Sequence, residues 1–176
     1  MKQLMVSALA AFSLFAGGCV LMQNSYVENA EFDLELARPG AAAPKLRAGV
    51  FKNLSCSDRR FLIRREDGQL SPLEYMRWRL APELLLQRCM YGAFTVEPEG
   101  EMSAPLLSAV IYRFEFDERD RTARLGIDFT LHGDRWRTVR ADFSEPVEQW
   151  GSGASRAAAM NKCVDRALAE LKGALK

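Results

Sequence analysis

The sequence of 176 residues predicts an α/β fold, a two-layer sandwich with a mostly antiparallel sheet and two main helices. Three segments between residues 108 and 143 alternate apolar and polar side chains, as half-buried strands do. Two other segments place apolar side chains three or four residues apart, which is typical of amphipathic helices. Strands and helices that are each apolar on one face bury those faces against one another, and this packing gives two layers.

The three alternating segments are separated by the short polar turns DERDR and HGDR, so they predict an antiparallel meander. One face of the first segment is expected to be buried and consists of Val110, Tyr112, Phe114 and Phe116. The corresponding face of the second segment consists of Ala123, Leu125, Ile127, Phe129 and Leu131. In the third segment Arg137 begins this face, and Val139, Ala141 and Phe143 follow on it. Shorter strands are expected earlier in the chain, in the segments EFDLEL, KLRAGVF, RRFLIR and AFTVEP.

The first helix is predicted over residues 71–90, because its start has the composition of a capping box. Ser71 offers a side-chain oxygen to the first turn, Pro72 suits the first helical position, and Glu74 completes the box. Pro82 is expected to bend or restart this helix, since proline removes a backbone donor.

The last helix is predicted to begin at Ser152 or Ser155 and to run to the end of the chain. An apolar stripe at helical spacing supports it. The stripe consists of Met160, Cys163, Val164, Ala167, Leu168, Leu171 and Leu175.

The amino-terminal residues 1–18 have the layout of a secretory signal peptide: a positive start, an apolar run from Leu4 to Phe15, and the small residues 16–18. The run is shorter than the ~20 residues of a membrane-spanning helix. Cys19 directly follows, as in a bacterial lipobox, and is therefore the expected lipid-attachment site. Cleavage by an ordinary signal peptidase after Gly18, or an unprocessed thiol, are the alternatives.

This layout divides the chain into a signal peptide at 1–18, a lipid-anchored tether at 19–30 and a single domain at 31–176. Val20 follows the cysteine where an aspartate would be the familiar inner-membrane retention signal, so the expected location is the periplasmic face of the outer membrane.

Composition and motifs give no indication of catalysis or of a cofactor. The formal net charge is +1, too small to draw nucleic acid. His132 is the only histidine and is interpreted as a turn residue beside Gly133. Cys56, Cys89 and Cys163 match no metal motif, and whether two of them form a disulfide is left open.

Two arginine-rich segments, DRRFLIRR and DRWRTVR, combine basic side chains with Phe61 and Trp136. Solvated faces with ion pairs are the expected role of these arginines. Contact with anionic lipid headgroups or with an acidic protein partner is the alternative.

The segment from Lys45 to Tyr91 resembles the ABC-type transport auxiliary lipoprotein family, which includes the PqiC-like lipoproteins. The resemblance is carried by Arg64 at the end of a strand, then Tyr75, Trp78, Pro82 and the leucine run 84–86. A meander and a terminal alanine- and leucine-rich helix follow in the same order.

The resemblance implies a non-enzymatic outer-membrane lipoprotein that assists an MCE-type phospholipid transport system. Its partners would be an MCE-domain periplasmic protein and an ABC permease with its ATPase, and a homo-oligomer stays open. Tyr75 and Trp78 are candidate partner-binding residues, although burial in the core is the favoured role of Trp78. A structural or assembly lipoprotein, serving lipopolysaccharide export or a secretion apparatus, is the alternative function.

Overall fold

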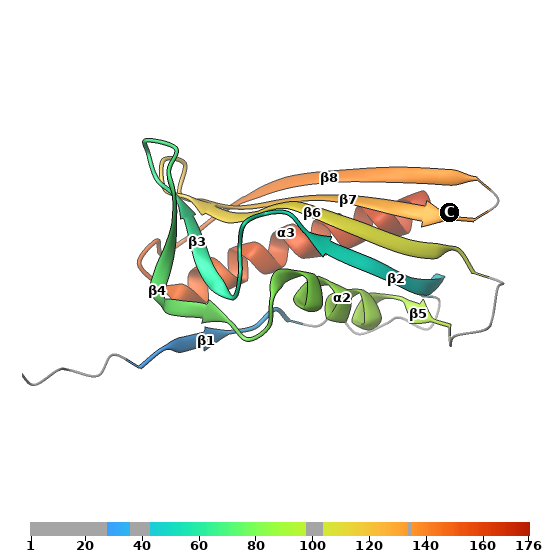
Figure 1. Cartoon of the computed structure of the whole chain (residues 1–176), viewed down its shortest axis with the longest axis horizontal. Helices are drawn as coiled ribbons and strands as arrows, with labels where there is room; N and C mark the ends of the chain where they lie inside the picture. Colours follow the sequence, from blue (N-terminus) through green and yellow to red (C-terminus); the bar gives the residue numbers. More distant parts are fainter. Residues whose placement is uncertain (1–27, 36–42, 98–103, 134) are drawn as a thin grey trace, which may run out of the picture.

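The computed structural model describes residues 28–35, 43–97, 104–133 and 135–176, and confirms the α/β two-layer fold. An eight-stranded sheet packs against two helices (Figure 1). The elements are β1 (Ala30–Phe32), β2 (Lys45–Asn53), β3 (Arg60–Arg64), β4 (Leu70–Trp78), α2 (Pro82–Ala93), β5 (Thr95–Val96), β6 (Leu106–Asp117), β7 (Thr122–His132), β8 (Trp136–Pro146) and α3 (Gly153–Ala174). Neither described helix combines the length and apolar character that a membrane span needs.

Strand β6 is the centre of the sheet. Along one edge it forms the long antiparallel ladder with β7, which pairs in turn with β8, as the meander predicts. Along its other edge it pairs in parallel with β2 near its start and with β3 near its end. The sheet is therefore partly parallel. The helices form the second layer, with α2 against β2 and β6 and α3 against β7 and β8.

A β-bulge between Ile111 and Arg113 changes which residues of β6 face the helices. Before the bulge the buried residues are Leu107, Ala109 and Ile111, and after it they are Phe114 and Phe116. The expectation that Val110 and Tyr112 share the buried face was therefore wrong, because one extra residue breaks the alternation. In β7 all five expected residues are buried, and in β8 Val139 and Ala141 are.

The helix expected over residues 71–90 was wrong in its first half. Leu70–Trp78 is β4, which pairs with β3 after a tight turn in which Gly68 has a φ of 86°. Backbone pairing on both sides, with β3 and with β1, outweighs the local preference of Ser71, Pro72 and Glu74 for a helix start. The helix α2 begins at Pro82, the residue at which a bend was expected.

The last helix has its predicted stripe buried, apart from Leu175, which is half-buried. Of the two serines considered for its start, Ser152 is the N-cap, since its side chain accepts a hydrogen bond of 3.3 Å from the Ser155 N–H. Strand β1 covers only Ala30–Phe32, shorter than the strand expected in EFDLEL, and Leu34 is buried just after it.

A cluster of aromatic rings forms the core beside the β3–β4 hairpin. The Trp78 ring is completely buried, with its centroid 4.4 Å from that of Phe61 and 5.3 Å from that of Phe114. Phe61 also lies 5.0 Å from Phe116 and 5.1 Å from Phe32. The cluster joins β1, β3, β4 and β6, so Trp78 is a core residue.

Replacing Trp78 by alanine should lower the free energy of unfolding by ~3–5 kcal/mol, because it leaves a large cavity among these rings. Denaturant unfolding of the purified variant measures the change. Tyr75→Ala is the matched control on the same strand; its side chain is exposed, and its effect should stay within ~0.5 kcal/mol. Equal stability of the two variants would contradict the core role of Trp78.

Candidate interaction surfaces

The amino-terminal segment of the domain is fixed against the first turn of α3. Strand β1 pairs in parallel with β4, placing Phe32 opposite Trp78. The Phe32 ring then lies directly over Gly153, where an added Cβ would come within 2.3 Å of Phe32 Cζ. Only glycine permits this close approach. The first described strand of the domain is therefore packed against the start of α3 at this contact.

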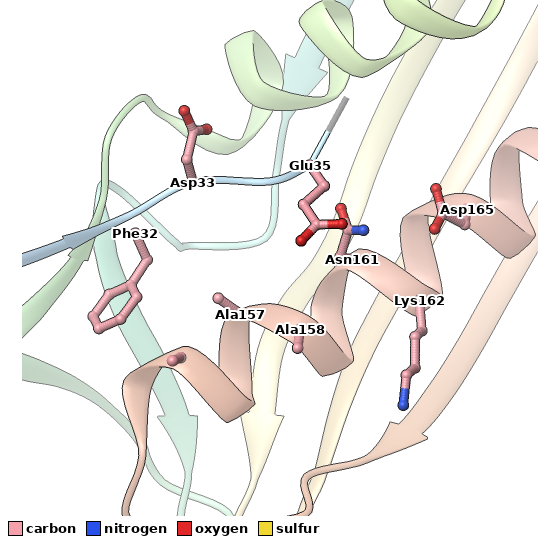
Figure 2. A pocket seen from close by; sticks show the side chains of 9 residues that line it. Phe32, Asp33, Glu35, Ala157, Ala158, Asn161, Lys162 and Asp165 are labelled. Carbon is pink, nitrogen blue, oxygen red and sulfur yellow. The ribbon is translucent and has the colours of Figure 1, made fainter. Parts of the chain in front are cut away.

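A groove of about 460 Å³ lies between this segment and α3 (Figure 2). It is lined by Phe32, Asp33, Glu35, Ala154, Ala157, Ala158, Asn161, Lys162 and Asp165. The alanines leave the space open, and Glu35 extends from the segment toward α3 beside Asn161. The groove is thus small, partly polar and more acidic than basic.

The charges of the groove are only partly balanced. Asp33 forms an ion pair with Arg88, and Lys162 Nζ lies 3.6 Å from Glu148 Oε1. The pKa of Asp165 is raised, first by burial and then by repulsion from Glu35. The groove thus brings the carboxylates of Asp33, Glu35 and Asp165 together with the ammonium group of Lys162.

The sheet face of β6, β7 and β8 that carries no helix is covered by cross-strand ion pairs. Arg140 pairs with Asp128 at 2.9 Å, and Arg113 reaches across β7 to Asp142 at 3.1 Å. Gly126 lies between Arg113 and Asp142 in the register, and the Tyr112 ring packs on it.

At the end of this face Arg64 makes two hydrogen bonds, of 2.7 and 2.9 Å, to the buried Glu115 carboxylate. Burial raises the pKa of the Tyr112 hydroxyl, and the negative charge of the nearby Asp142 raises it further. This face of the sheet is therefore polar, and its charged side chains neutralise one another in pairs.

The two sequence-predicted partner-binding residues lie in different environments. Tyr75 is 49% exposed on β4, whereas Trp78 is buried and cannot contact a partner in the folded domain. Cys19, the expected lipid-attachment site, lies outside the described residues. His132, interpreted as a turn residue, is the last residue of β7, and its ring meets that of Trp136 edge-on at 4.5 Å.

The three cysteines of the domain are free thiols, which answers the open question of a disulfide among them. Cys89 and Cys163 are buried, and burial raises the pKa of each thiol to about 12. Such thiols stay protonated and unreactive at neutral pH. No group of three or more His, Cys, Asp or Glu side chains in the described ranges is placed to hold a metal ion.

Little in the sequence indicated the most exposed large apolar side chain in the described part of the chain, Trp136, which is 77% exposed. The only signal was its position between two arginines. On α2, Leu84 and Tyr91 are also about half exposed, two turns apart on one side of the helix.

Comparison with known proteins shows the fold of the chain. No protein-family model matches the sequence, and no curated protein does. A crystal structure of an uncharacterized protein is similar with a TM-score of 0.72 and 9% identity, over 85% of this chain and 99% of that one. Protein XCC0632 from Xanthomonas campestris, of family DUF330, is similar with a TM-score of 0.61 and 17% identity, over 82% of this chain and 93% of that one.

Gly153→Ala should destabilise the domain by ~1–3 kcal/mol, because the new methyl group overlaps the Phe32 ring. Denaturant unfolding measures the loss, and limited proteolysis at residues 28–35 should become faster as β1 loosens. Gly151→Ala is the control, since an added Cβ there meets nothing within 4 Å. If the two variants are equally stable, the Phe32–Gly153 contact does not hold the segment.

Proposed function

We propose that this protein is a lipid-anchored outer-membrane lipoprotein, a non-enzymatic auxiliary component of an MCE/ABC-type phospholipid transport system that docks the machine to the outer membrane. The observation that carries the proposal is the fold shared with XCC0632, a member of DUF330, over 82% of this chain. The sequence resemblance, from Arg64 through the leucine run 84–86, suggests the PqiC-like lipoproteins and supports the same proposal.

The amino-terminal architecture supports an anchored protein. A signal-like segment ends at Cys19, and ten residues separate that cysteine from Ala30, the first residue of β1. At ~3.3–3.6 Å per residue, a tether of this length reaches at most about 40 Å. The fixed contact of Phe32 with Gly153 would then transmit the position of the anchor to the rigid domain.

The surfaces of the domain favour protein contacts over catalysis. The buried thiols have a pKa of about 12, and His132 is engaged with Trp136 rather than with a nucleophile. The exposed Tyr75 offers an aromatic contact of the kind that often dominates protein interfaces. An MCE-domain protein together with its ABC permease and ATPase is the proposed partner.

Cys19→Ala should abolish acyl-chain labelling and move the protein from the membrane to the soluble fraction. The reason is that a lipid-modified cysteine is the only anchor proposed, and residues 16–18 still offer an ordinary cleavage site. Metabolic labelling with a radioactive fatty acid and fractionation of the envelope provide the measurement. Cys56→Ala, at an exposed thiol, is the control and should keep its label. Persistent labelling of Cys19→Ala would refute the proposed anchor.

When the affinity-tagged protein is purified from gently solubilised envelopes, the MCE-domain protein of the transport system should co-purify with it. Tyr75→Ala should weaken that association about ten-fold, because the interface loses an aromatic side chain. Immunoblotting and quantitative mass spectrometry measure the recovery. Leu84→Ala is the matched control, because Leu84 is 48% exposed but lies on α2.

Recovery of lipopolysaccharide-export or secretion proteins, with no MCE-domain protein, would reject the transport role and support an assembly lipoprotein. Equal recovery by Tyr75→Ala and Leu84→Ala would remove Tyr75 from the interface while leaving the partner itself identified.

A further inference from the structure

A second cleft, of about 500 Å³, opens at the end of the domain opposite β1. It lies where the last residues of β7 and the first of β8 meet the carboxyl end of α3, at the end of the molecule that carries the C-terminus in Figure 1. Its lining consists of Pro105, Leu131, Gly133, Arg135, Trp136, Arg137, Ala174 and Leu175. The volume is in the range of small-molecule sites.

The apolar part of the cleft is exposed to solvent. Trp136 is 77% exposed although it begins a strand, and the edge-on contact with His132 at 4.5 Å orients its ring. The buried Leu131 and the half-buried Leu175 continue the apolar surface on the inner side. The indole ring and these leucine side chains thus give the cleft one apolar wall.

The cationic part of the cleft comes from Arg135 and Arg137, on either side of Trp136. Neither arginine forms an ion pair with a carboxylate of the described residues, unlike the four arginines of the other basic segment. Arg137 donates one hydrogen bond to the Ala174 carbonyl at the end of α3, which fixes its side chain at the cleft. A guanidinium group has five N–H donors, so donors remain for an anion.

An apolar cleft flanked by arginines complements a molecule with a hydrocarbon chain and a phosphate. Arginine matches phosphate oxygens well, and the indole of tryptophan suits the boundary between hydrocarbon and water. We infer that this cleft binds one phospholipid molecule, with an acyl chain against Trp136 and Leu131 and the phosphate at Arg135 and Arg137. The inference rests on the proposed role in phospholipid transport and names the ligand-binding site that this role would use.

The position of the cleft distinguishes it from the membrane anchor. Helix α3 has 22 residues, so its ends lie about 33 Å apart. Phe32 contacts the first of these residues, and the cleft is at the last. A phospholipid in the cleft is therefore remote from β1, the first described strand of the domain.

The test uses the full-length chain carrying Cys19→Ala, so that acyl chains of the protein itself do not compete for the cleft. Isothermal titration calorimetry with dihexanoylphosphatidylglycerol, kept below its micelle concentration, should show binding of one lipid per chain. Trp136→Ala should weaken this binding at least about ten-fold, and Arg135→Gln should also weaken it about ten-fold. Leu84→Ala, at an exposed apolar residue away from the cleft, should leave it unchanged. Thermal melts confirm that each variant is folded.

Two further probes separate the possible sources of a signal. Glycerophosphoglycerol, which lacks acyl chains, should bind far more weakly than the lipid; equal affinity would make the cleft a phosphate site and overturn the inference. Binding to phosphatidylglycerol vesicles without binding of the dispersed short-chain lipid would indicate a contact with the membrane surface and would also overturn the inference. Equal lipid affinity of Trp136→Ala and Leu84→Ala would overturn it as well. If the protein binds no lipid but the MCE-domain protein still co-purifies, only the lipid-binding inference is wrong. If the protein binds lipid but no MCE-domain protein co-purifies, only the proposed transport role is wrong.

Discussion

The packing of Trp78 against Phe61, with ring centroids 4.4 Å apart, is the interaction on which the rest of the domain depends. The two rings connect β4 to β3, and Phe114 and Phe116 connect them to the central strand β6. Phe32 continues the cluster to β1 and meets α3 at Gly153. Without this cluster, the hairpin and the amino-terminal segment would have only backbone pairing at a sheet edge, and such pairing is weak when little apolar surface is buried. The proposed connection between membrane anchor and domain is therefore made through the aromatic core.

The sequence predicted the elements whose signal is local and missed those that distant parts of the chain decide. The β7 strand and α3 have long, regular apolar patterns, and both were predicted with their buried residues. The segment 71–78 has the capping residues of a helix but pairs as β4, because β1 and β3 satisfy its backbone. In β6, the bulge after Ile111 depends on the register with β7, which no single segment encodes.

The candidate sites follow the same division. Tyr75 and Trp78 were chosen together as neighbours on a helix, but both lie in strand β4, where residues three apart point to opposite faces of the sheet. The cleft at Trp136 is formed by Pro105, the ends of β7 and β8, and the last residues of α3, which are far apart in sequence. Sequence reasoning could identify the tryptophan between arginines, but the apolar wall opposite it exists only in the folded domain.

The two arginine-rich segments show how the same composition can serve two purposes. In the first, Arg59, Arg60, Arg64 and Arg65 each have a carboxylate partner, and Phe61 is buried, so the segment is internally neutral and structural. In the second, Arg140 is paired with Asp128, whereas the arginines beside Trp136 have no carboxylate partner among the described residues. A charge that is already paired contributes little to binding a new anion, because the existing partner must first be displaced. Of the two segments, only the second therefore leaves arginines available to an anionic ligand, at the end of the domain farthest from β1, where the exposed Trp136 ring can also cover a hydrocarbon chain.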